Sequence, residues 1–178
     1  DYIECRIHKN WRWDYNIGGG QLLDWIGHHC DIAHWGMDMD RSGPSEVRPI
    51  QVHMPPRTDI WNTATKYRAE ASYAGDITMT IAGSHNDIKM GTKWIGSDGW
   101  VYVNRGSYDC SNPAYKKLIK KREGDKVVEA AKEPDLGDDI IKSRLYKTPG
   151  HHRNFLDCVK SRQPTVTPVE TAHRSATP

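Results

Sequence analysis

Two carboxylates and an imidazole in the first third of the chain have a spacing that could support proton transfer. Asp24, His28 and Asp31 stand at positions i, i+4 and i+7, so a helix would carry all three on one side. A carboxylate one turn from an imidazole can orient the ring and raise its basicity, as a general base near neutral pH requires. An ordinary ion pair on a helix surface has the same spacing. We therefore predict Asp24 and His28 as a candidate catalytic pair, with the surface pair as the alternative.

The residues just before this helix are of the types that bind sugars. Arg12, Trp13, Asp14 and Tyr15 combine aromatic faces with hydrogen-bonding groups, and a run of three glycines follows them. Glycines at a helix start permit the close approach of a ligand or of a neighbouring domain. We predict these four residues as candidate substrate contacts. The alternative is a packed segment that crosses a sheet, and it applies to the tryptophan more than to Arg12 and Asp14.

Other kinds of site have less support in the sequence. His28 and His29 would point to different sides of a helix, and no pair of histidines has the spacing of a zinc-binding helix, so we expect no metal. No G-x-S-x-G elbow is present. The sequence also contains neither G-x-G-x-x-G nor G-x-x-x-x-G-K-[ST], so it has no nucleotide-binding fingerprint of its own.

The composition predicts one polar domain with aromatic surfaces. The 178 residues suit a single domain, and seven Trp and eight Tyr accompany one Phe, which favours half-exposed aromatic surfaces. The net charge of +2 comes from well-mixed charges, so we expect no nucleic-acid partner. No apolar run reaches the length of a membrane span, so we expect no membrane partner. The four cysteines have no metal or disulfide spacing and are expected to be free thiols.

Helices and antiparallel strands must position the candidate residues. Apolar periodicity predicts the first helix over residues 20–37. Residues 46–54 are predicted to be extended, with Pro49 indicating an edge strand or a bulge. Hairpins are predicted over 65–84 and 93–105, which makes at least five strands joined by short turns and implies an antiparallel sheet. Polar residues alternate along the strands, so one face is expected to be wet or covered by another polar surface.

The C-terminal half is predicted to contain three more helices. A helix is expected over 113–122, followed by a charged surface insertion to residue 148. A second helix is expected over 151–161, and a third is expected to have its N-cap at Thr167, with His173 in its first turn. The chain ends at Pro178 soon after this third helix begins, which we interpret as truncation. Three side chains of the second helix are predicted to point inward: Phe155, Cys158 and Val159.

Four separated motifs stand out along the chain: GGGQLLDWIGHHCDIAHWGM, NTATKY, KWIGSDGWVYVNRG and HHRNFLDCVKSRQPTVTPVETAHRSAT. They resemble the C-terminal domain of the Gfo/Idh/MocA family, which contains glucose-fructose oxidoreductases and inositol dehydrogenases. The likeness is closest to a bacterial subgroup of sugar dehydrogenases and covers residues 10–177, with the motifs in the expected order. The segment WRWDYNIGGG looks shorter than in that family, and the last helix ends early.

The resemblance implies a fold of the α/β (α+β) class. Such a domain has a large, mainly antiparallel open sheet with helices packed on one face, like the C-terminal domain of glyceraldehyde-3-phosphate dehydrogenase. It packs against a separate Rossmann domain, which this sequence lacks, and often forms homo-oligomers through the sheet. Residues 1–178 would then form one substrate-binding and oligomerisation domain.

The resemblance also implies an NAD(P)-dependent oxidoreductase that acts on a secondary alcohol of a sugar, cyclitol or sugar derivative. In that family His28 would exchange the proton of the reacting hydroxyl, and Asp24 would position it. Asp31 would be structural or bind substrate, and His173 is a further candidate substrate contact. NAD or NADP would belong to the parent enzyme, and none is expected to bind this chain alone. Expected partners are a sugar or polyol, the missing Rossmann domain and a second copy of the chain.

Two other function classes stay open at this point. The chain could be a stand-alone carbohydrate-binding or assembly module that kept the fold and lost the chemistry. It could also belong to a non-redox lyase or hydrolase that uses the same Asp24–His28 pair. We expect a cytoplasmic protein, with periplasmic export if an upstream signal exists.

Overall fold

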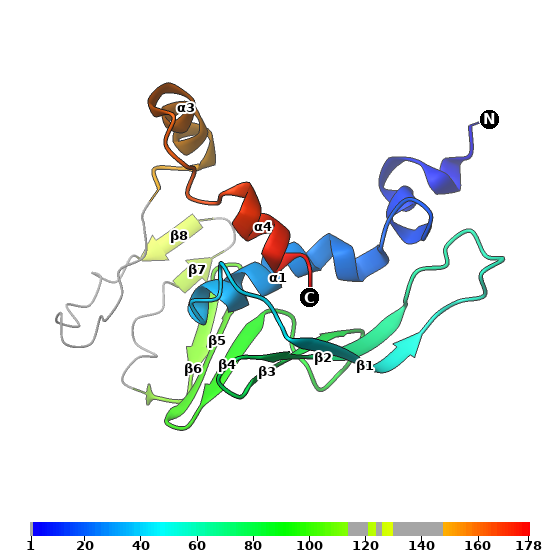
Figure 1. Ribbon diagram of the computed structural model, residues 1–178, viewed down its shortest axis with the longest axis horizontal. Coiled ribbons are helices and arrows are strands. Elements are labelled where there is room, and N and C mark those ends of the chain that lie inside the picture. Colours follow the sequence, from blue (N-terminus) through cyan, green and yellow to red (C-terminus); the bar gives the residue numbers. More distant parts are fainter. Residues whose placement is uncertain (1, 114–120, 124–125, 130–147) are drawn as a thin grey trace. The chain divides into compact units, whose positions relative to one another are not determined.

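The computed structural model describes residues 2–113, 121–123, 126–129 and 148–178 (Figure 1). The chain divides into two compact units. The first contains Asp1–Met90 and Glu170–Pro178, and the second contains Gly91–Val169. Helices and antiparallel sheets occur together, so the predicted α+β class is confirmed at that level. The described strands form three separate sheets, of three, three and two strands.

The first unit begins with two short 3-10 helices that lead into α1. These are η1 (Glu4–Arg6) and η2 (His8–Trp13), and α1 covers Gly20–Gly36, as the apolar periodicity predicts. Gly20 has a φ of +65° and packs so closely on Thr63 that a Cβ would lie 2.5 Å from the threonine Oγ1. A side chain at this position would clash and be strained, so glycine is what lets the helix start against the loop before the sheet.

The sheet of the first unit consists of β1 (Glu46–His53), β2 (Lys66–Tyr73) and β3 (Ile77–Gly83), in that order and antiparallel. The predicted edge strand is confirmed, because β1 pairs on one side only and its register shifts between Pro49 and Gln51. The β2–β3 hairpin is also confirmed. Three residues link the paired strand ends, and two of them, Gly75 and Asp76, have positive φ values.

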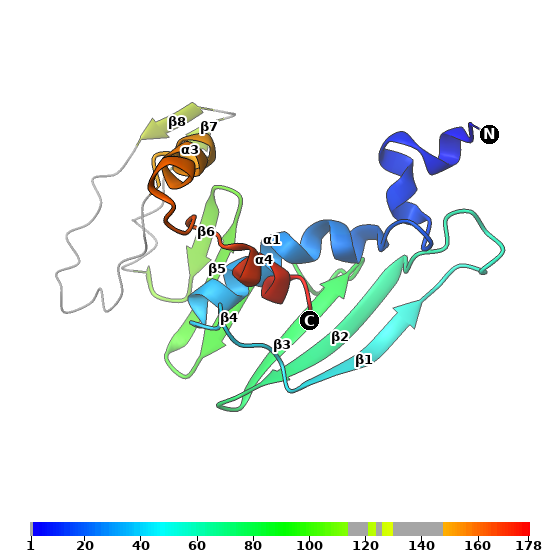
Figure 2. The same ribbon diagram turned by 45° about the horizontal axis from the view of Figure 1, so that its top comes forward.

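Helix α1 packs on one face of this sheet, over β2 and β3 (Figure 2). Strand β2 alternates so that Tyr67, Ala71 and Tyr73 are buried against the helix. The other face carries polar residues, with an ion pair from Arg48 on β1 to Glu70 on β2 at 2.8 Å. This arrangement matches the prediction of one apolar and one polar face.

Helix α4 (Val169–Ser175) begins two residues beyond the N-cap that the sequence predicts at Thr167, directly after Pro168. Its last residue, Ser175, is 1% exposed and its hydroxyl donates to the Ala172 carbonyl.

The second unit begins with a three-stranded antiparallel meander. It consists of β4 (Thr92–Gly96), β5 (Gly99–Asn104) and β6 (Ser107–Cys110), so the second predicted hairpin is confirmed. A small hairpin follows, formed by β7 (Lys121–Glu123) and β8 (Lys126–Glu129). The helix predicted over 113–122 is therefore wrong at residues 121 and 122, while residues 114–120 lie outside the described residues. Most of the predicted insertion, residues 130–147, also lies outside them.

Helix α3 (His151–Ser161) has the predicted bounds but not the predicted buried face. Phe155 and Val159 are 60% and 45% exposed, so their inward placement is wrong, and Cys158 is half-buried. Asn154 is buried instead, because its Oδ1 accepts from the Val166 backbone N–H at 3.1 Å. The polar side of the helix thus holds the following loop in place.

Among the described residues, no helix is both long enough and apolar enough to cross a membrane.

Candidate functional site

The candidate catalytic residues lie on the side of α1 that faces away from the sheet. Asp24 and His28 are exposed and Asp31 is half-buried. The buried side of the same helix carries Ile26, Cys30, Ala33 and His34. Because the apolar residues take the side that packs on β2 and β3, the polar stripe is left open to a ligand or to another domain.

Asp24 has a partner that the sequence did not predict. Its Oδ2 accepts a hydrogen bond from Nη1 of Arg12 at 3.1 Å, and both side chains are about one third exposed, at 32% and 30%. The His28 ring instead meets the Trp25 ring edge-on, with centroids 5.6 Å apart. Within the described part of the chain, no hydrogen bond or ion pair joins Asp24 to His28. Asp24 and His28 are thus neighbours on the helix, but their side chains are not bonded to each other.

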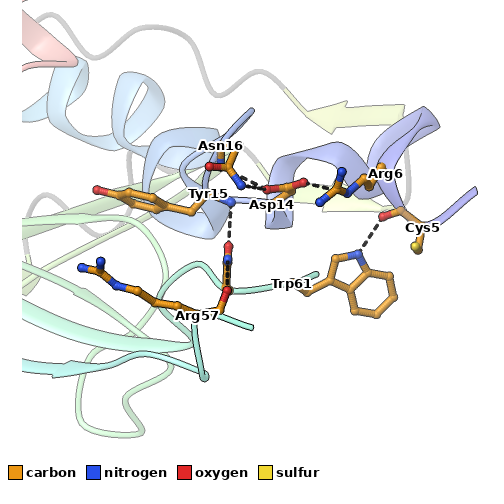
Figure 3. Close-up of polar contacts among 8 residues, drawn as sticks. Cys5, Arg6, Asp14, Tyr15, Asn16, Arg57 and Trp61 are labelled. Carbon is orange, nitrogen blue, oxygen red and sulfur yellow. Dashed lines mark hydrogen bonds and ion pairs between the residues drawn. The ribbon is translucent and has the colours of Figure 1, made fainter. Parts of the chain in front are cut away.

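Asp14, predicted as a substrate contact, is buried and stabilises the turn before α1 through hydrogen bonds. It is 1% exposed, and its Oδ1 accepts from both the backbone N–H and the Nδ2 of Asn16, each at 3.0 Å (Figure 3). Its Oδ2 lies 3.2 Å from Nε of Arg6. The Asp14 carbonyl also accepts from the N–H groups of Ile17 and Gly18. These contacts fix the chain between η2 and α1, and leave the carboxylate inside rather than facing a ligand.

The loop before β2 holds the same segment from the other side. The Tyr15 N–H donates to Oδ1 of Asn62 at 2.8 Å (Figure 3). The Trp13 carbonyl accepts from the backbone N–H groups of Asn62 and Thr63. Trp61 Nε1 donates to the Cys5 carbonyl at 2.8 Å. The Trp13 side chain is half-buried, so this residue contributes to packing through its ring and to the backbone hydrogen bonds through its carbonyl.

The Tyr15 ring is exposed to solvent, although hydrogen bonds from the loop before β2 hold the Tyr15 main chain. The side chain is 68% exposed, and Figure 3 shows the ring pointing away from the polar contacts. Sequence analysis missed Asn62 and Trp61 as the residues that fix this segment. The NTATKY motif, which begins at Asn62, was the signal that could have found the first of them.

A second group of ionisable residues lies beneath α1, and burial keeps it uncharged. His34 is fully buried, its Nε2 is 2.7 Å from the Tyr73 hydroxyl, and burial lowers the pKa of His34. Burial also raises the pKa of Cys30 to about 12 and raises the pKa of Tyr73. Groups held neutral and away from solvent cannot exchange protons readily with a ligand, so this group is structural.

His173, the last predicted substrate contact, lies elsewhere in the first unit. It is exposed on α4 and lines an open groove of about 600 Å³ formed with residues 42–47. Neither Asp24 nor His28 lines this groove. The structure therefore brings Arg12 and Asp24 together beside His28, and places His173 in a different depression.

No group of three or more His, Cys, Asp or Glu side chains that could hold a metal ion occurs among the described residues. The exposed groups that remain are an imidazole, a carboxylate and a guanidinium, which suit proton transfer and the binding of oxygen-rich ligands. No protein-family model, curated protein or solved structure matches the chain.

Proposed function

We propose that the chain is the substrate-binding and catalytic part of an NAD(P)-dependent oxidoreductase. Its substrate would be a secondary alcohol of a sugar, cyclitol or sugar derivative. The observation that carries the proposal is the exposed side of α1, where His28 and Asp24 lie one turn apart and Arg12 contacts the carboxylate. The resemblance of the GGGQLLDWIGHHCDIAHWGM segment to the Gfo/Idh/MocA family supports the same reading. The large, mainly antiparallel open sheet of that family is proposed as well, although the described strands are grouped in three separate sheets.

The proposed reaction assigns one task to each exposed group. His28 accepts the proton of the substrate hydroxyl, the carbon bearing that hydroxyl loses a hydride, and a ketone results. A nicotinamide cofactor held by a separate nucleotide-binding domain would supply the hydride acceptor. Asp24 orients the imidazole and stabilises it once it is protonated. Tyr15 offers an exposed aromatic face on which a sugar ring can stack.

The test uses the full natural protein that contains this sequence. Reduction of NAD⁺ or NADP⁺ is followed with a panel of hexoses, inositols and sugar acids. Replacing a general base costs about 10²- to 10⁴-fold in rate, so His28→Asn is expected to lower kcat by that factor. His29→Asn is the matched control, because His29 is the neighbouring imidazole and stacks on Trp25. Its kcat is expected to stay within about threefold of wild type. Equal loss in the two variants would contradict the role of His28.

A carbohydrate-binding module without chemistry is a second candidate, favoured by the exposed aromatic side chains in the segment before α1 and the loop before β2. Trp11, Tyr15 and Trp61 are 43%, 68% and 49% exposed. Such a module would lose sugar affinity in Tyr15→Ala and keep it in His28→Asn. Calorimetric titration of the sugars that the enzyme assay identifies, or of the whole panel if none reacts, separates the two functions.

We also propose that another protein surface covers β1. This edge strand is exposed along its whole length, and it carries Val47, Ile50 and Val52 at 46%, 47% and 51% exposure. Apolar edge strands that stay open pair readily with other chains. A second copy of the chain is the proposed partner. Light scattering is expected to give at least a dimer for the wild type and a smaller species for Val52→Lys.

A further inference from the structure

The Asp24 carboxylate lies near two side chains that can hydrogen-bond to it, and it makes a hydrogen bond to only one of them. Arg12 Nη1 donates to its Oδ2 at 3.1 Å. His28 follows four residues later on the same side of α1, a spacing at which side chains on a helix are neighbours. We propose that Arg12 is a positioning residue that controls the Asp24–His28 pair. While the guanidinium holds the carboxylate, His28 lacks its orienting partner, and a ligand that draws Arg12 away completes the pair.

Arg12 is suited to such exchange because only part of its hydrogen-bonding capacity is used. A guanidinium has five N–H donors in a planar fork, and Asp24 accepts from one nitrogen. Nε of Arg12 is buried and makes no hydrogen bond within the part of the chain that the structure describes. Ion pairs that are about one third exposed are weak, so the oxygen atoms of a ligand can replace the carboxylate at small cost.

The main chain that carries Arg12 is fixed, so the exchange involves the side chain. The next residue, Trp13, gives its carbonyl to the N–H groups of Asn62 and Thr63, and Asp14 closes the following turn. A rigid backbone below a long, partly used side chain lets the guanidinium turn between Asp24 and a ligand without unfolding the segment. A sugar offers vicinal hydroxyl oxygens, and a sugar acid a carboxylate, as acceptors for the guanidinium.

The consequence for His28 follows from the charges around it. The charged groups on its own helix are Asp24 and Asp31, and Arg12 of η2 contacts Asp24. With Arg12 on Asp24, the guanidinium offsets part of the negative charge of that carboxylate. With Arg12 elsewhere, the carboxylate favours the protonated imidazole. The catalytic meaning of this control rests on the proposed oxidoreductase function, but the control itself can be measured without sugar or cofactor.

The experiment follows the ring protons of His28 by NMR as a function of pH, in the chain as it stands. Four proteins are compared: wild type, Arg12→Gln, Asp24→Asn and the double variant. Arg12→Gln is expected to raise the midpoint pH of the curve of His28 ring-proton shift against pH by about half a pH unit or more. In the Asp24→Asn background the same change is expected to move it clearly less. Asp24→Asn alone is expected to have little effect, and Arg12→Lys, which keeps the charge, is expected to resemble wild type.

Two outcomes would overturn the proposal. If Arg12→Gln moves the midpoint equally with and without Asp24, the guanidinium acts on His28 only through its own charge. If Asp24→Asn alone lowers the midpoint strongly, the carboxylate already serves His28 while Arg12 is present. Circular dichroism of each variant checks that the fold is retained. Neither outcome depends on nucleotide reduction, so failure here and failure of the proposed function are separate results.

Discussion

Each side of α1 carries a histidine, and the two histidines have opposite environments. On the buried side, His34 is completely enclosed and bonded to Tyr73. On the exposed side, His28 touches one aromatic ring and has a carboxylate one turn away. Burial favours the neutral His34 ring and outweighs the nearby Asp40 and Asp31 carboxylates, whereas an exposed imidazole stays available for proton exchange. Burial, and not residue type, therefore separates the structural histidine from the candidate catalytic one.

The largest expected effect concerns a thiol on the buried side. Burial raises the pKa of Cys30 from the ordinary 9.0 to about 12, three units, so its thiolate fraction at a given pH is about a thousandfold lower. We expect iodoacetamide to label Cys30 in the native protein at least about a thousandfold more slowly than an ordinary thiol. Cys5, which is half-buried in the same unit, is the comparison. Mass spectrometry of the labelled peptides measures both rates, and similar rates would mean that α1 does not stay packed on the sheet.

The next effect is on the free energy of unfolding. His34→Ala removes a fully buried ring and leaves the Tyr73 hydroxyl without its partner, so we expect a loss of about 3 kcal/mol. His28→Ala changes an exposed side chain on the same helix and is expected to stay within about 0.5 kcal/mol of wild type. Urea unfolding of the two variants measures the difference. Equal losses would erase the contrast between the two sides of the helix.

The pH dependence of stability sharpens the same contrast. Burial lowers the pKa of His34 below the ordinary 6.5, although Asp40 and Asp31 act against this. The unfolded chain therefore binds this proton at a higher pH than the folded chain. Stability contributed by neutral His34 is present above about pH 6.5 and falls as the pH drops below it, by at most about 1.4 kcal/mol per pH unit.

His34→Gln is the control for this pH dependence, because glutamine cannot titrate. We expect the difference in unfolding free energy between wild type and His34→Gln to become less favourable to wild type between about pH 7 and pH 5. Asp40 also contributes to the pH dependence, and because it interacts with the His34 ring the difference removes only the part of its effect that is the same in both proteins. Burial raises the pKa of that carboxyl, so its protonation stabilises the folded state at lower pH. A difference that does not change with pH would show that the His34 ring titrates as in the unfolded chain.

Local patterns explain what the sequence could predict. The start of α1 at Gly20, the bulge near Pro49 and the β2–β3 turn each depend on residues close together in the chain. Helical periodicity, the missing N–H of proline and the positive φ of turn residues act over that range. These elements agree with the predictions.

The contacts that the sequence could not predict are long-range. Arg12 meets Asp24 only because the intervening turn is closed by Asp14 and held by Asn62, which lies 47 residues from Tyr15. The inward face of α3 was predicted wrongly for a related reason. Apolar periodicity favours burial of Phe155, but a backbone hydrogen bond to the loop at Val166 determines that Asn154 is buried. Such side-chain-to-backbone bonds leave no periodic signal.

The smallest expected effect belongs to the ion pair on the exposed side of α1. Asp24→Asn removes the charge that Arg12 contacts, and pairs of this exposure contribute about 0.2 to 1 kcal/mol at low ionic strength. At about 1 M salt the screening length is about 3 Å, so we expect this difference to vanish. Tyr73→Phe, which removes the buried hydrogen bond to His34, is expected to cost about 1 kcal/mol at either salt concentration. Unfolding curves at low and high salt measure both. An effect of Asp24→Asn that persists in high salt would mean that the carboxylate is part of the packed structure and is not available to exchange between Arg12 and His28.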